Sequence, residues 1–310
     1  MKDKIFNTLI VTISLFVFIA LIVSKSIIYD SIMYALNMWV NNLIPALFPF
    51  FIISDILINY NITDYIPQNI KKICKYIFNI NDASLTIFIL SMLSGFPSNA
   101  RNTRTLYDAG MIGADEANHI LMFSHFANPV FIMTTVGLFF FSNKKIGIFL
   151  LVIHYLSNFI LGICVRNVYQ HNEQIVVQKK GQNFGKIFIS SIRKAIDTTI
   201  TICGIITVFL LLASIIINYF KISLYNQMII KGLFEITIGL DALSKLSLGM
   251  NYKLIIASMF LAFGGISVHI QVLSQIVDTD IKYQYFLVGR IYQTVIAGIL
   301  AFFSILLLGI

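Results

Sequence analysis

The chain has 310 residues, 58% of them hydrophobic and 12% charged, and its mean hydropathy is +0.85. Charged residues are about half as frequent as in an average soluble domain, which excludes a soluble globular protein. The formal charge is +8, but the basic residues lie mostly in short segments between apolar runs, so nucleic acid is not expected as a partner. The three cysteines have no metal-binding or redox spacing.

Apolar runs of about 20 residues, the length that crosses a bilayer as a helix, recur along the chain. The clearest runs are Ile5–Val23, Ser31–Ile58, Ala117–Phe141, Ile146–Val165, Thr198–Tyr219 and Tyr285–Leu308. No small-residue cleavage site follows the first run, so residues 1–27 are expected to remain as a transmembrane anchor. The runs predict an all-α polytopic membrane protein, with the lipid bilayer as its first partner.

Two polar segments divide the apolar pattern. The first, Asn59–Asp82, has isoleucines at helical spacing with lysines on the other side, which predicts an amphipathic helix at the membrane interface. The second, Arg166–Lys194, is polar and basic, as is typical of a linker. The predicted order is a first repeat over 28–141, a connecting transmembrane helix over 142–166, the linker over 167–194 and a second repeat over 195–310.

The stretch LSMLSGFPSNARNTR, residues 90–104, interrupts an apolar helix with Gly95 and Pro97 and continues with polar residues. Backbone groups freed at bilayer depth must be buried in protein or face water, because each unsatisfied group costs several kcal/mol in lipid. A re-entrant helical hairpin, which enters the membrane and returns to the same side, meets this requirement.

A weaker copy of this break follows in the second half. The segments 83–100 and 252–269 align, and their matched positions include Gly95 with Gly264 and Ser98 with Ser267. Because the connecting helix adds one crossing, the second copy would enter the membrane from the opposite side. The fold prediction is therefore an inverted repeat with two broken, re-entrant helical hairpins.

Two such hairpins would bring their tips near the middle of the bilayer, where inverted-repeat transporters bind substrate. The predicted helix breaks are Gly95, Pro97, Gly264 and Gly265. Ser98 and Ser267 are expected as N-caps of the half-helices that follow, and exposed N–H groups at those helix starts favour an anion. The other candidate substrate-binding side chains are Asn99, Arg101, Arg104, Asn128, His269, Gln271 and Arg290.

Arginines among these candidates also have structural explanations. Arg290 lies inside the last span, where it could bind substrate, pair with Asp278 or Asp280, or extend its side chain to the interface. Arg101 and Arg104 are followed by acidic residues that indicate an aqueous boundary.

Other polar residues leave alternatives open too. Asn128, which precedes a proline in an apolar run, could form a packed kink or a binding contact. Glu235, in GLFEITIGL, could pair with an arginine, carry a coupling proton or lie at the interface. His119, His125 and His154 have no metal spacing, so packing is expected for them.

An enzyme and a membrane scaffold are the rival functions. Ser98 and His125 could act as nucleophile and base, but the chain has no G-x-S-x-G, H-E-x-x-H or phosphate-binding glycine motif. A scaffold would explain the hydrophobicity but not two polar breaks. We therefore expect a transporter of a small anion, not an enzyme, without a cofactor or metal; whether it forms a homo-oligomer is left open.

Four segments carry a family resemblance: LIPALFPFFIISDIL, SGFPSNARNTRTLYDAGMIGADEANHILMFSHFANPVFI, GLFEITIGL and FGGISVHIQVLSQIVDTDIKYQYFLVGR. In their order and spacing they resemble the YlbJ-type sporulation integral membrane proteins, the stage V sporulation protein V family, which carry nucleoside-recognition (Gate) domains. The first break departs from the family pattern Gly-Tyr-Pro-Thr-Gly-Ala-Lys, because Asn99 replaces a small residue and Arg101 replaces lysine.

The resemblance implies transport of dipicolinic acid across the outer forespore membrane, from the mother cell towards the developing spore. Dipicolinate is a planar aromatic dianion, and helix starts, arginine and histidine suit its carboxylates. Another solute, such as a nucleoside, is the alternative that Gate-domain relatives allow. The coupling ion and any sporulation membrane partners do not follow from the sequence.

Overall fold

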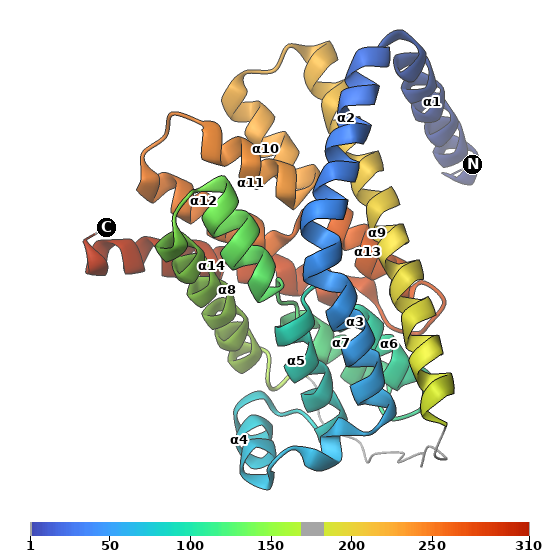
Figure 1. Cartoon of the computed structure of the whole chain (residues 1–310), viewed down its shortest axis with the longest axis vertical. Helices are drawn as coiled ribbons and strands as arrows, with labels where there is room; N and C mark the ends of the chain where they lie inside the picture. The colour runs from blue at the N-terminus through green and yellow to red at the C-terminus, as the bar shows by residue number, and fades with distance from the viewer. Residues whose placement is uncertain (1, 169–182, 310) are drawn as a thin grey trace.

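The computed structural model describes residues 2–168 and 183–309, which form helices joined by short loops, without strands (Figure 1). The elements are α1 (Lys2–Val23), α2 (Lys25–Met38), η1 (Trp39–Leu43), α3 (Ile44–Asn59), η2 (Ile62–Tyr65), α4 (Gln68–Phe78), α5 (Asp82–Ser94), α6 (Ser98–Asp108), α7 (Ala114–Phe123), η3 (Phe131–Phe140), α8 (Lys144–Cys164), α9 (Phe184–Phe220), α10 (Leu224–Phe234), α11 (Ile236–Lys245), α12 (Met250–Phe263), α13 (Gly265–Ile276) and α14 (Tyr283–Leu308). Among the described residues, five helices are long and apolar enough to cross a membrane, or six if the bent pair α4–α5 is one span. This confirms an all-α polytopic membrane protein.

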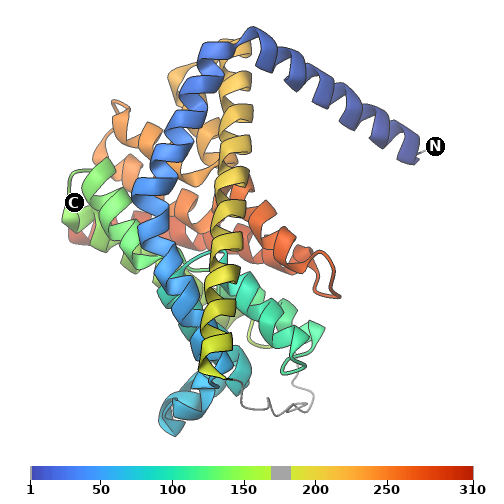
Figure 2. The same ribbon diagram turned by 45° about the vertical axis from the view of Figure 1, so that its right-hand side comes forward.

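Two long helical segments form a central antiparallel pair (Figures 1 and 2). One runs through α2, η1 and α3 from Lys25 to Asn59, and the other is α9, whose 37 residues span about 55 Å. Trp39 donates a hydrogen bond across the pair to the carbonyl of Thr199 at 3.0 Å. Because α9 begins at Phe184, the end of the predicted linker is helical; its residues 169–182 lie outside the described ones.

Two helical hairpins pack beside the long pair. The first, α5–α6, turns at Gly95, where the sequence places a break; the φ of +77° there belongs to the region that favours glycine. The second, α10–α11, turns at Glu235, where the sequence predicts no hairpin. Its helices touch at Gly232 and Gly239, and a Cβ on Gly239 would overlap the backbone of Gly232. Small residues therefore let this second hairpin close.

Two further helices are interrupted along their length. Helical structure stops at 124–128 after α7 and resumes before η3, so Ala117–Phe141 is not one continuous span. α12 and α13 are interrupted at Gly264 and together form a 27-residue candidate span, Met250–Ile276. The prediction of a second re-entrant hairpin at this position is therefore wrong. Gly264 and Gly265 show that a helix is interrupted, but not whether the chain then reverses.

The order of elements favours a different pairing of the two halves. Each half contains a long helical segment, a hairpin, a broken helix and a final helix, which is α8 in the first half and α14 in the second. α14 contacts α7 and α8, and α8 contacts α12, so the corresponding helices of the two halves pack against each other. On this pairing Glu235 corresponds to Gly95, and Gly264 corresponds to the interruption at 124–128. The helix over 142–166 then closes the first half.

Two elements lie at the periphery. α1 projects away from the bundle (Figure 2), as a membrane anchor would. α4 is bent by 92° from α5 and is tied to it by an ion pair of 3.0 Å between Lys71 and Asp82. Ile70 and Ile73 on α4 are exposed. An amphipathic helix at right angles to a spanning helix fits the membrane interface.

Candidate functional site

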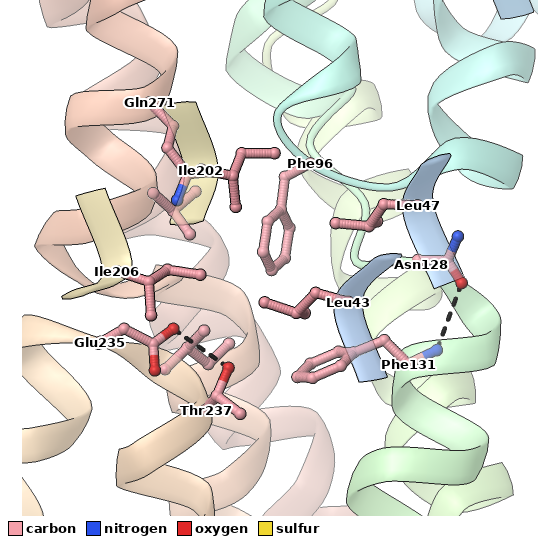
Figure 3. A pocket seen from close by; sticks show the side chains of 12 residues that line it. Leu43, Leu47, Phe96, Asn128, Phe131, Ile202, Ile206, Glu235, Thr237 and Gln271 are labelled. Carbon is pink, nitrogen blue, oxygen red and sulfur yellow. Dashed lines mark hydrogen bonds between the residues drawn. The ribbon is translucent and has the colours of Figure 1, made fainter. Parts of the chain in front are cut away.

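Four helix starts converge on one pocket between the two halves (Figure 3). Phe96 precedes α6, Asn128 precedes the helical segment 129–140 that contains η3, Glu235 precedes α11, and Val268 lies in the first turn of α13. The long pair adds four aliphatic side chains, Leu43, Leu47, Ile202 and Ile206. The cavity measures about 30 Å³, which is room for about two water molecules. In this conformation the cavity is too small for an organic ligand.

Two of the four helix starts are capped by their own side chains. Asn128 accepts a hydrogen bond from the N–H of Val130 at 2.8 Å and so caps the segment 129–140. Glu235 accepts from the N–H of Ile238 at 3.0 Å and from the hydroxyl of Thr237 at 3.1 Å, and so caps α11. Backbone donors that would attract an anion are therefore occupied by protein groups at these two starts.

The starts of α6 and α13 have no side-chain cap. Their N-cap residues are Pro97 and Gly264, which have no side-chain acceptor. Ser98, predicted as a cap, is already the first residue of α6, and its hydroxyl donates to the carbonyl of Gly95. α13 begins two residues before Ser267, whose hydroxyl has no hydrogen-bond partner. Both N-cap predictions are wrong: no side chain caps either helix start, although the N–H of Ser98 donates to the carbonyl of Gly95 at 3.0 Å.

The two uncapped starts lie close together. α6 and α13 run side by side (Figure 2), and Arg104 of α6 donates to the carbonyl of Gln275 in α13 at 3.3 Å. The ring of His125 stacks on Phe96, with ring centroids 4.9 Å apart. A Cβ on Gly264 would lie 3.5 Å from Nε2 of His125. The imidazole therefore lies between the residues that precede α6 and α13.

Buried polar groups without partners lie in the first turns of α6 and α13 and on His125. Asn99, His125 and Ser267, here called the open polar cluster, are 0% exposed. Both amide atoms of Asn99, both ring nitrogens of His125 and the hydroxyl of Ser267 have no hydrogen-bond partner. A buried polar group left unpaired costs about 1–3 kcal/mol. Several such groups beside two free helix starts are arranged to bind a ligand that carries hydrogen-bond acceptors.

Arg290 is fully buried and binds the carboxyl ends of two helices. It donates to the carbonyl of Met122 at 2.8 Å and to those of His125 and Ala262 at 3.4 Å each. The negative ends of the α7 and α12 dipoles thus face the guanidinium. No described ion pair joins Arg290 to the aspartates between α13 and α14. Arg290 stabilises the helix ends at the two interruptions, and it does not line the pocket.

Arg101 and Arg104 do not line the pocket either. Arg101 lies 3.5 Å from a carboxylate oxygen of Asp55, which also pairs with Lys194 of α9 at 3.1 Å. This buried carboxylate connects the first hairpin to both long helices. Arg104 pairs with Asp108 one turn later at 2.7 Å, on a partly exposed face. Both arginines therefore have structural partners.

Of the predicted site residues, Asn128, Gln271 and Glu235 line the pocket. The ring of His269 instead hydrogen-bonds the hydroxyl of Tyr283 at 2.7 Å and a backbone carbonyl of α12 at 3.1 Å. The predicted breaks at Gly95 and Pro97 enclose Phe96, which enters the pocket; those at Gly264 and Gly265 place the start of α13 beside it.

Asn128 also joins the first hairpin to the rest of the pocket. Its amide donates to the carbonyls of Ala46 at 2.8 Å and Leu93 at 3.3 Å. A Cβ on Gly95 would come within 2.5 Å of the backbone nitrogen of Asn128. Glycine is therefore required at the hairpin tip for close approach as well as for its positive φ.

Sequence reasoning missed several residues of the site. Phe131, Thr237 and Val268 line the pocket. The two apolar residues carry no specific signal in a chain that is 58% hydrophobic, and a single threonine next to an apolar run carries little. His125 is assigned to packing in the sequence, and it is packed, but between the two uncapped helix starts. The feature of the sequence that could have indicated His125 as a site residue is its position between the end of a helix and the Asn128-Pro129 break.

No protein-family model matches the chain, and no solved structure matches it. The chain is 28% identical to the sporulation integral membrane protein YlbJ of Bacillus subtilis (strain 168) over 335 aligned residues, which cover 96% of the chain and 82% of that protein. This similarity along nearly the whole chain confirms that it resembles the YlbJ-type sporulation integral membrane proteins, and with its apolar helices it identifies the chain as an integral membrane protein.

Proposed function

We propose that the chain transports a small organic anion across the membrane during sporulation, and that the anion is dipicolinic acid. The observation that carries the proposal is the open polar cluster between the uncapped starts of α6 and α13. Helix starts and neutral donors bind carboxylates without a fixed positive charge in the site. The sporulation relative and the family resemblance supply the choice of dipicolinate.

The chemistry of the cluster suits a carboxylate. The amide of Asn99, the hydroxyl of Ser267 and the ring of His125 are each able to donate one hydrogen bond. The N–H groups in the first turns of α6 and α13 add further donors. Phe96, already stacked on His125, offers an aromatic face to a planar ring.

The closed pocket supports transport by alternating access. The pocket meets the cluster through Phe96, which lines the pocket and stacks on His125. Its volume of about 30 Å³ does not admit an aromatic dicarboxylate, so transport would require the site to widen. The long pair α2–α3 and α9 would serve as the frame, and the two hairpins with the broken helices would move against it. We further propose that the two halves are Gate-like repeats and that the protein acts in the mother-cell or outer forespore membrane.

A neutral solute such as a nucleoside is the second candidate. One observation favours it: Glu235, Thr237 and Gln271 in the same pocket could bind hydroxyl groups. A carboxylate that accepts such hydrogen bonds would repel a dianion. Competition between the two solutes separates these alternatives.

The test uses purified protein in liposomes and measures exchange of labelled dipicolinate against internal unlabelled dipicolinate, with a nucleoside as competitor. Ser267→Ala and Asn99→Ala should each lower exchange by about tenfold or more, because a hydrogen bond to a charged group is worth about 1.5–3 kcal/mol. The matched controls are Ser274→Ala on α13 and Asn251→Ala on α12, at exposed positions.

Unchanged exchange in both site variants would contradict the assignment of the cluster. Absence of dipicolinate exchange by folded wild type would overturn the choice of dipicolinate, and nucleoside exchange in its place would select the second candidate.

A further inference from the structure

Glu235 is an acid in the pocket that the proposed anion site does not use. Its side chain is 1% exposed and lies beside Thr237 on the pocket wall (Figure 3). No basic residue in the described part of the chain forms an ion pair with it. A buried carboxylate without a counter-ion is costly, and within membrane proteins such acids mark ion and proton pathways.

No ion pair among the described residues neutralises Glu235. The elements around it carry several titratable or charged groups, and none of those described forms an ion pair with Glu235. They include Tyr34 on α2, Cys203 and Asp197 on α9, Lys231 on α10, Asp241 and Lys245 on α11, Lys253 on α12, His125 at the interruption after α7 and His269 on α13. The hydroxyl of Tyr34 donates to Asp241 at 3.3 Å. The pocket wall from α9 consists of isoleucine side chains. The charge of Glu235 is therefore balanced only by the hydrogen bonds at the start of α11.

The start of α11 touches the open start of α13. A Cβ built on Gly265, the first residue of α13, would lie 3.4 Å from Cα of Glu235 and 3.2 Å from the backbone nitrogen of Ile236. An anion bound at the start of α13 would therefore meet a like charge at short range, away from bulk water. By linkage, protonation of Glu235 strengthens anion binding, and the bound anion strengthens proton binding by the same factor.

We propose that Glu235 takes up one proton from the aqueous phase when the anion binds and returns it to water on the other side when the anion leaves. Transport is then the symport of one proton with the anion. This inference rests on the proposed function and adds its energy source, the pH gradient.

The experiment measures dipicolinate in two assays with proteoliposomes, both at clamped zero membrane potential. The first is exchange without a gradient, and the second is accumulation driven by an internal pH one unit above the external pH. Wild type should accumulate dipicolinate about tenfold through the proton's contribution, because one pH unit is a tenfold ratio of protons. Glu235→Gln should exchange within about threefold of wild type but lose accumulation. Asp241→Asn, on the same helix, is the matched control and should keep both.

A second measurement needs no variant. Dipicolinate added to wild-type vesicles that contain a pH-sensitive dye should acidify their interior, and a saturating sodium gradient should not replace the pH gradient. Accumulation retained by Glu235→Gln, or substrate movement without proton movement in wild type, would overturn the proposal. Absence of exchange in wild type would instead refute the proposed function, on which this proposal depends.

Discussion

The helix starts before α6 and α13 differ from those before α11 and the segment 129–140 in the residue at the N-cap. Asn128 and Glu235 fold their own acceptors onto the free N–H groups. Pro97 and Gly264 have no acceptor to offer. Two of the helix starts around the pocket are thus capped by their own side chains, and two have no side-chain cap. Under the proposed function, this difference distinguishes the frame of the site from its binding surface.

The carboxyl ends of the helices at the same interruptions differ from the uncapped starts, because a side chain binds them. The ends of α7 and α12 are both bound by Arg290, a residue distant in sequence from each. Arg290 therefore binds the negative ends of α7 and α12, while no side chain caps the positive ends of α6 and α13. An anion is the ligand that this imbalance favours.

The largest effect is expected from removal of Arg290, the donor that three backbone carbonyls share. Arg290→Met leaves the carbonyls of Met122, His125 and Ala262 without their donor, so the free energy of unfolding should fall by about 3 kcal/mol. Thermal unfolding in detergent checks this, with Arg193→Met at an exposed site of α9 as control. Equal melting temperatures for the two variants would contradict the role of Arg290.

A smaller loss is expected at a capped start. Asn128→Ala removes the cap of the segment 129–140 and the donor to Ala46, which should cost about 2 kcal/mol. Asn143→Ala removes a similar cap from α8 at an exposed position and should cost about 1 kcal/mol or less. If Asn143→Ala proved more destabilising than Asn128→Ala, burial would not make the Asn128 cap the stronger of the two.

An uncapped start should respond in the opposite sense. Ser267→Ala removes a buried hydroxyl that has no partner, so the free energy of unfolding should stay unchanged or rise by up to about 1 kcal/mol. Ser98→Ala loses bonded contacts at the neighbouring start and should lower it by about 0.5–1 kcal/mol. Melting curves of the two variants measure the difference. A clear loss of stability in Ser267→Ala would show that the hydroxyl of Ser267 stabilises the fold.

The smallest effect is expected outside the pocket. Arg104→Ala breaks the partly exposed pair with Asp108 and should change the free energy of unfolding by about 0.5 kcal/mol or less. Dipicolinate exchange should remain close to that of wild type. A severe loss of exchange at unchanged stability would extend the binding surface along α6.

The class of protein and several of the places where helices stop could be predicted from the residues alone, but the turn at Glu235 could not. Apolar runs predict spanning helices because lipid requires internally satisfied backbone, and Gly95 with Pro97 predicts a break because neither residue continues an apolar helix. Polar side chains near the breaks, among them Asn99, Asn128 and Ser267, can be recognised from the sequence as candidate site residues in the same way. These are local properties, set by a residue and its near neighbours in the chain.

Whether the chain reverses or continues at each helix break depends on packing between segments distant in sequence. That the chain reverses at Glu235 but continues past Gly264 depends on helices that are distant in sequence, such as the contact of Gly265 with the second hairpin. Whether a polar side chain is satisfied depends likewise on the groups that packing brings to it: Arg290 finds three carbonyls, whereas Ser267 finds none. Helix formation is a short-range property, but hydrogen-bond satisfaction at a helix end is settled only after the whole chain has packed.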